Sequence, residues 1–127
     1  MGVNSEHIAR LKAIRVTNTD QMLTAGRTAE NRAELAKNAG IPLEAVVELV
    51  KLSDLARLPG VKGIRARLYY DAGVETVEEL AAWEPEGLLV MTTEFVNATG
   101  FPGIAPLPKE VSSTIATARK MPKIVEW

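Results

Sequence analysis

Apolar side chains recur along this chain at the spacing of α-helices, and this periodicity limits the fold more than any other feature. Residues 5–15 place Ile8, Leu11 and Ile14 on one face of a helix. No segment longer than a few residues alternates apolar and polar side chains as a half-buried strand does. The sequence therefore predicts an all-α fold in one compact helical domain.

Three kinds of residue mark the expected helix ends. Short polar side chains cap the free amides at a helix start, proline suits the first helical position, and glycine suits the position after the last turn. The marking residues are Asn18, Thr28 and Thr76, then Pro42, Pro85 and Pro108, then Gly26, Gly40 and Gly100. They predict helices over 5–15, 18–26, 28–40, 85–100 and 108–120, and further helices that begin near residues 42, 64 and 76.

Helical spacing also selects the expected core. Ala33 and Leu35 are expected to point inward from the helix over 28–40. The other expected core residues are Val46, Val47, Leu49, Val50, Leu88, Met91, Phe95, Val111, Ile115 and Ala118. Tyr69 and Tyr70 could stack on nucleotide bases, but we expect them at the core boundary. We expect Trp83 to anchor the core and the segment 123–127 to lie against it.

The chain has the length of one domain, at 127 residues, and it contains two internal similarities. Residues 31–41 resemble residues 64–74, and residues 16–23 resemble residues 74–81. Two copies of a helical unit, each too small to fold alone, would share one core. We therefore divide the single domain, 1–127, into a first unit at 1–56, a second unit at 57–100, and a Pro-rich turn with a last helix at 101–127.

The composition excludes several kinds of site. There is no cysteine and only one histidine, His7, so disulfides, thiolate metal sites and thiol nucleophiles are excluded. We expect no metal and no cofactor. The net charge of −1 argues against binding of a polyanion over the whole surface, so any contact with nucleic acid has to be local.

Two further absences bear on location and activity. No apolar run approaches the roughly 20 residues of a membrane span, and the opening residues lack the apolar core of a signal peptide. We therefore expect a cytoplasmic protein with no membrane partner. Asp54, Glu94 and Glu110 are scattered, with no paired carboxylates or phosphate-binding loop around them, so we do not expect an enzyme.

The stretch LPGVKGIRARLYYDAG, residues 58–73, predicts a helix, a tight hairpin and a second helix. Pro59 ends the first helix, and Gly60 permits a positive φ. Gly63 permits a close approach by another group just where the next helix leaves its first amides unpaired. Around the turn, Asp54 alone opposes the four basic residues Arg57, Lys62, Arg65 and Arg67. Arg67 also has Asp71 four residues later, and Arg65 has Tyr69 at the same spacing, so both arginines could instead belong to a solvated helix face.

This stretch resembles the helix-hairpin-helix motif, in which an apolar residue, proline, glycine, an apolar residue and a second glycine precede an alanine. Leu58, Pro59, Gly60, Val61 and Ala66 match that pattern, whereas Lys62 occupies the place of the second glycine and Gly63 is displaced by one. Over residues 10–98 the chain resembles a family of tandem helix-hairpin-helix-like domains of unassigned function. The resemblance implies that hairpin amides contact a phosphate, and Lys62 could itself reach a phosphate oxygen.

The upstream copy of the hairpin, TAGRTAENRAEL at residues 24–35, has Gly26 and no second glycine. Arg27, Thr28 and Arg32 are its candidates for contact with a nucleic-acid backbone. If this copy binds nothing, its role is to complete the core.

Three functions remain open from the sequence. The first is weak, sequence-independent binding of a DNA or RNA backbone through Gly60, Lys62, Gly63, Arg65, Arg57, Arg67, Arg27 and Arg32. The second is a protein-interaction or homodimerisation module with a purely structural hairpin, which receives another chain at that turn or along 101–108 and 123–127. The third is binding of a small anionic ligand at the hairpin.

Overall fold

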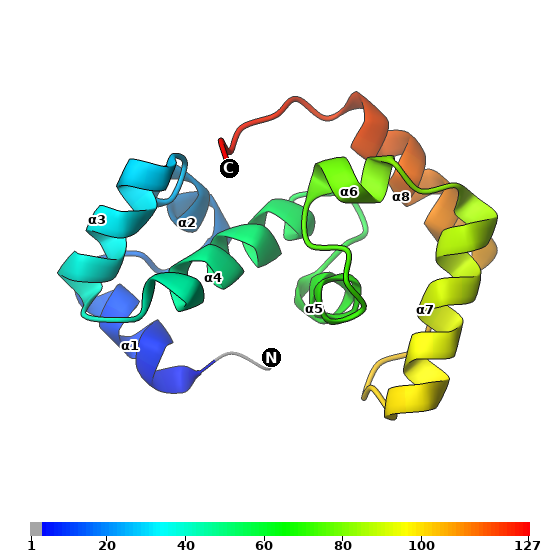
Figure 1. Cartoon of the computed structure of the whole chain (residues 1–127), viewed down its shortest axis with the longest axis horizontal. Helices are drawn as coiled ribbons and strands as arrows, with labels where there is room; N and C mark the ends of the chain where they lie inside the picture. The colour runs from blue at the N-terminus through cyan, green and yellow to red at the C-terminus, as the bar shows by residue number, and fades with distance from the viewer. Residues whose placement is uncertain (1–3) are drawn as a thin grey trace.

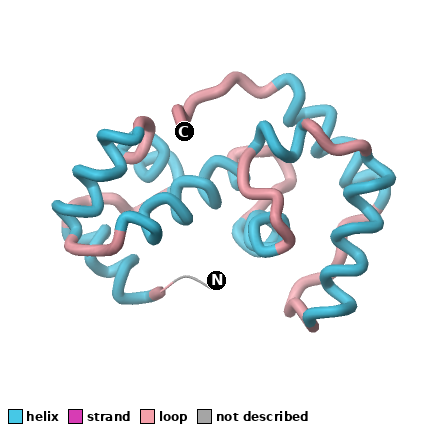
Figure 2. The backbone as a smooth tube through the Cα atoms, viewed as in Figure 1, coloured by secondary structure: helices cyan, strands magenta, loops and turns pink. Residues whose placement is uncertain are grey.

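The structure, a computed structural model, describes residues 4–127 and is all-helical over them, with eight helices and no strand. Residues 1–3, part of the segment searched for a signal peptide, lie outside the described residues. Helices α1 to α3 lie around one end of α4, and α5 to α8 lie beyond its other end (Figures 1 and 2). The helices are α1 (Ser5–Ala13), α2 (Thr19–Ala25), α3 (Ala29–Ala39), α4 (Leu43–Ala56), α5 (Gly63–Asp71), α6 (Val77–Ala81), α7 (Pro85–Thr99) and α8 (Pro108–Lys120).

The predicted caps are confirmed. The side-chain oxygens of Asn18, Thr28 and Thr76 accept hydrogen bonds from amides three residues later, at 2.8, 3.1 and 3.1 Å. These bonds satisfy amides that have no partner inside the helix. Pro85 and Pro108 are the first residues of their helices, whereas Pro42 lies one residue before α4.

The ends of α1, α3 and α5 turn in the same way. A residue with positive φ follows each helix: Arg15 at 68°, Gly40 at 69° and Gly73 at 104°. The next amide then donates back to a carbonyl five residues earlier, from Val16 to Leu11, from Ile41 to Ala36 and from Val74 to Tyr69. Each of these hydrogen bonds therefore satisfies a carbonyl near the end of its helix.

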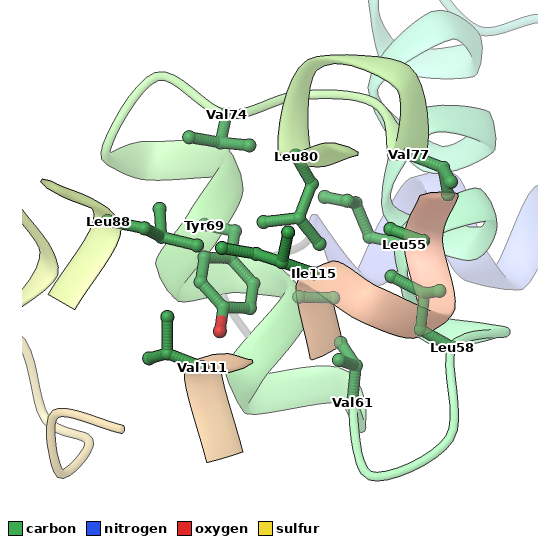
Figure 3. Packing of buried hydrophobic residues seen from close by; sticks show 12 residues of the cluster. Leu55, Leu58, Val61, Tyr69, Val74, Val77, Leu80, Leu88, Val111 and Ile115 are labelled. Atoms are coloured by element: carbon green, nitrogen blue, oxygen red, sulfur yellow. The ribbon is translucent and has the colours of Figure 1, made fainter. Parts of the chain in front are cut away.

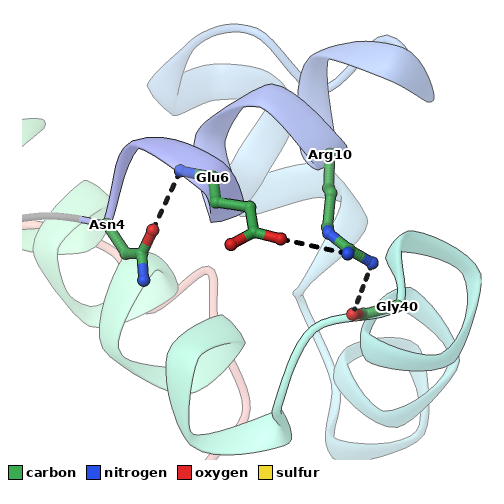
Figure 4. A network of polar contacts seen from close by, with 4 residues as sticks. All are labelled: Asn4, Glu6, Arg10 and Gly40. Carbon is green, nitrogen blue, oxygen red and sulfur yellow. Dashed lines mark hydrogen bonds and ion pairs between the residues drawn. The ribbon is translucent and has the colours of Figure 1, made fainter.

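Helix α1 is fixed to the end of α3 by a short polar network (Figure 4). Asn4 accepts a hydrogen bond from the Glu6 amide at 2.9 Å, and Glu6 pairs with Arg10 at 3.1 Å. Arg10 also donates to the carbonyl of Gly40 at 3.1 Å. The arginine thus satisfies a carbonyl at the left-handed turn that ends α3.

The buried apolar side chains form two clusters. The first cluster joins α1 to the middle of α4, and the second joins the end of α4 to α5, α6, α7 and α8 (Figure 3). Val46 and Val50 of α4 belong to the first cluster and Leu55 of α4 to the second. Helix α4 therefore connects two clusters where the sequence suggested one shared core.

The predicted inward position of Ala33 is wrong. Ala33 is exposed, whereas Leu35, Ala36 and Ala39 of α3 are buried. Arg32 takes the inward position at this turn, with 5% of its surface exposed. Helical spacing alone did not distinguish the alanine from the arginine beside it.

Residues 122–127, here called the C-terminal strap, run back from α8 towards α2 and α3 (Figure 1). Val125 is 2% exposed in the first cluster, and the amide of Glu126 donates to the carbonyl of Arg27 at 2.8 Å. The expected packing of this segment against the core is confirmed. The strap joins the end of the second cluster to the first.

Candidate functional site

The turn between α4 and α5 keeps its apolar residues inside and its glycines outside. Leu58 and Val61 are 1% and 2% exposed, and each amide bonds to a carbonyl three residues earlier, at 3.2 and 3.0 Å. Gly60 lies at the exposed tip with φ of 81°, a conformation that favours glycine. Two buried anchors thus fix the position of an exposed turn.

The first amides of α5 are open. Lys62 precedes the helix without a side-chain cap, and its carbonyl accepts from the Ala66 amide at 2.8 Å. The amides of Gly63, Ile64 and Arg65 have no acceptor among residues 4–127. A Cβ built at Gly60 or at Gly63 would meet no atom within 4 Å. An anion could therefore approach these amides without displacing a side chain.

A cleft of about 530 Å³ lies beside this turn. Its lining combines the turn residue Gly60 and the charged residues Lys62, Arg65 and Glu110 with a mainly apolar set. The apolar lining consists of Ile64, Phe101, Pro102, Gly103 and Ile104. The segment 101–104 was not expected at this turn, because it lies about 40 residues further along the chain and no local pattern places it there.

The predicted basic cluster is largely neutralised, and the expectation that Asp54 is its only acid is wrong. Arg57 bonds to Asp54 at 2.7 Å and to the carbonyl of Pro122 at 2.9 Å. Arg65 pairs with Glu110 at 2.7 Å and donates to the carbonyl of Ile104. Burial raises the pKa of Asp54, and the Arg57 hydrogen bond opposes that rise.

Arg67 lies apart from the cleft. Its guanidinium pairs with Glu48 of α4 at 2.6 Å and with Asp71 at 2.9 Å, and it lies 5.1 Å from the Tyr70 ring centre. Only 11% of its side chain is exposed. Arg67 joins α5 to α4, so the structure does not bring it to the predicted site.

Lys62 differs from these arginines. Its side chain is exposed, it lines the cleft, and it has no hydrogen bond or ion pair in the part of the chain that the structure describes. Of the candidates around the second hairpin, Gly60, Lys62 and Gly63 therefore stay available to a ligand.

The first hairpin is closed. Gly26 is buried, and a Cβ there would lie 2.3 Å from a methyl carbon of Val50. Arg32 is buried and donates to the carbonyls of Gly26 and Glu126 at 2.9 and 2.8 Å, so the structure does not present this candidate at the surface. Arg27 is exposed, and Thr28 caps α3.

The aromatic residues take structural positions. Tyr69 is fully buried, its hydroxyl has no hydrogen-bond partner among residues 4–127, and burial raises its pKa to about 12. Tyr70 is half-buried, and Trp83 is partly buried against the second cluster. Neither tyrosine lines the cleft.

Fold and site together define an all-helical domain with an exposed hairpin turn beside a mixed polar and apolar cleft. The chain belongs to the family described as Domain of unknown function (DUF4332), whose model matches residues 1–121. The prediction that the chain belongs to a family of unassigned function is thereby confirmed. The match ends before the C-terminal strap.

The other comparisons and searches gave no positive finding. No curated protein and no solved structure matched the chain. Over residues 4–127, no helix combines the length and apolar character needed to cross a bilayer. The same residues contain no group of three or more His, Cys, Asp or Glu side chains placed to hold a metal ion.

Proposed function

We propose that this domain binds the phosphate backbone of a nucleic acid, weakly and without sequence preference, at a helix-hairpin-helix turn. The observation that carries the proposal is the set of three open amides at Gly63, Ile64 and Arg65. The partial positive charge of a helix start favours an anion at this place. Lys62 beside it adds a full charge.

The pairing of the arginines limits the strength of this contact. Arg57 and Arg65 already bond to carboxylates, so Lys62 is the main unpaired cation at the turn among the described residues. Each neutralised phosphate contributes about one power of salt concentration to the affinity. We therefore expect a salt slope of about one to two and micromolar or weaker binding.

Lys62→Glu tests the proposal by fluorescence anisotropy with short single-stranded and duplex oligonucleotides at low and moderate salt. We expect binding at low salt to weaken about threefold to tenfold and the salt slope to fall by about one. Lys37→Glu is the control, because Lys37 is also exposed but lies in the last turn of α3. Equal losses in both variants would indicate a non-specific charge effect and contradict the proposal.

Gly63→Ala tests the amides without changing charge. The added methyl group meets no protein atom, so we expect an unchanged melting temperature, but it would obstruct a phosphate at the helix start. Gly87→Ala is the control, because its Cβ would make only an ordinary contact with Trp83 at 3.6 Å. If a folded Gly63→Ala variant binds as tightly as the wild type, these amides do not contact the phosphate.

A protein ligand is the second candidate, and the exposed apolar residues beside the turn favour it. Ile104 and Leu107 are 84% and 68% exposed, and Ile64 is 41% exposed. If the ligand is a second copy of the chain, light scattering over a dilution series detects a dimer that Ile104→Asp dissociates. Competition with inorganic phosphate distinguishes a small anionic ligand from a polymer. If the natural ligand is a small anion, inorganic phosphate should bind as tightly as an oligonucleotide.

A further inference from the structure

We infer, on the premise of the proposed phosphate binding, that the C-terminal strap masks a second phosphate contact at the first hairpin. This contact consists of Arg32 with Arg27, and displacement of the strap exposes it. The nucleic-acid backbone bound at the second hairpin is the ligand that would use it.

Arg32 is a buried cation without a paired anion. It is 5% exposed and makes no ion pair with any residue from 4 to 127. Its guanidinium donates to the carbonyls of Gly26, Arg27 and Glu126, at 2.9, 3.3 and 2.8 Å. Buried charges in proteins are ordinarily paired with an opposite charge, and neutral carbonyls replace one only in part. A phosphate at this place would supply the missing negative charge.

The strap supplies the covering contacts. Glu126 provides the third carbonyl for Arg32, and its amide donates to the carbonyl of Arg27 at 2.8 Å. The ring of Trp127 lies 5.0 Å from the Arg32 guanidinium carbon and 5.8 Å from the Lys51 ammonium. An oligonucleotide therefore reaches Arg32 only after the strap has moved.

Few contacts hold the strap. Val125 is its only fully buried side chain and Ile124 is half-buried against the first cluster, whereas the other four strap residues are exposed. Arg57 holds the other end through the carbonyl of Pro122 at 2.9 Å. Release of an extended segment recovers its conformational freedom, so a segment with so few buried contacts opens more readily than the helices do.

Arg27 extends the contact that opening would create. Its side chain is exposed, with no hydrogen bond or ion pair to the rest of residues 4–127. Release of Glu126 frees one donor of Arg32 beside it, while the carbonyl of Arg27 still accepts from Arg32 at 3.3 Å. Two cations on one hairpin would add about one to two powers of salt dependence to binding.

The test compares the full chain with a chain that ends at Met121, by anisotropy with labelled oligothymidine. We expect the shortened chain to bind about tenfold more tightly at low salt, with a salt slope steeper by about one. Arg32→Gln should remove this gain in the shortened chain. Lys37→Gln in the shortened chain is the matched control and should keep the gain.

Three additions protect the test against a folding defect. Circular dichroism checks the helix content of the shortened chain, and Val125→Asp in the full chain displaces the strap while keeping its length. A synthetic peptide with the sequence MPKIVEW, added to the shortened chain, should restore the weaker binding. A folded shortened chain that binds no more tightly, or a gain that survives Arg32→Gln, overturns the inference.

The outcomes also separate the two proposals. If Lys62→Glu abolishes binding by the full chain while removal of the strap changes nothing, the second hairpin binds and the masked contact is refuted. If only the shortened chain binds, through Arg32, the masked contact stands and the function proposed for the second hairpin fails. If neither chain binds at low salt, both are refuted.

Discussion

Tyr69 places a hydroxyl in the second core cluster without a hydrogen-bond partner among residues 4–127. A buried polar group without a partner costs stability that its removal recovers. We therefore predict that Tyr69→Phe leaves the free energy of unfolding at neutral pH unchanged or raises it by about 1 kcal/mol. Urea unfolding followed by circular dichroism measures the difference. A loss of stability would mean that the hydroxyl is satisfied in the folded protein.

The same substitution has a predicted pH dependence. The folded pKa of Tyr69, about 12, lies above the usual value of 10, so the unfolded chain loses this proton first as pH rises. The contribution of Tyr69 to stability is thus complete below pH 10 and is lost as pH rises towards 12. Across that window, the free energy of unfolding of Tyr69→Phe should rise relative to that of the wild type by up to about 3 kcal/mol. Tyr70→Phe is the comparison: burial raises the pKa of Tyr70 too, but this phenol is only half-buried, so we expect a smaller gain in the same direction.

At the scale of single residues, the sequence predicted which side chains near the turn are basic, but it did not predict which of them form ion pairs. Lys62 was expected as a cation at the turn, and the structure leaves it exposed there. Arg65 was expected beside it, but Glu110, 45 residues later, neutralises it. A local pattern shows which residues are basic and not which distant acids will reach them.

At the scale of elements, Gly26 determines how closely the end of α2 approaches α4. A Cβ at this position would lie 2.3 Å from a methyl carbon of Val50, which is itself fully buried. We predict that Gly26→Ala destabilises the protein by about 1–3 kcal/mol, because the core around Val50 cannot yield without cost. Thermal or urea unfolding tests this, with Gly87→Ala as a neutral control. Equal stability of the two variants would show that α2 can move away from α4.

The sequence predicted the positions and ends of the helices, but it predicted only part of the buried face of each helix. The capping residues Asn18, Thr28 and Thr76 act through neighbours three residues away, so the bonds that matter are local. The choice between Arg32 and Ala33 as the inward residue depended on the carbonyls of Gly26 and Glu126. One of those carbonyls lies 94 residues from Arg32, beyond the range of any periodic pattern.

At the scale of the whole molecule, α4 and the C-terminal strap connect two clusters of buried side chains. The sequence predicted the all-helical class and the break between helices at 58–62, because both depend on short-range patterns. It did not predict the apolar lining of the cleft, because Phe101 and Ile104 lie between α7 and α8, about 40 residues beyond the turn that they meet. The site is therefore a product of the complete fold, although its amides belong to one turn.

The most direct test of the account is a set of ¹H–¹⁵N amide spectra recorded while short oligothymidine is added at low salt. Binding at the hairpin predicts that the amides of Gly63, Ile64 and Arg65 shift most, that Gly87 does not shift, and that Lys62→Glu reduces the shifts. An oligonucleotide that binds while these three amides keep their positions would contradict the account.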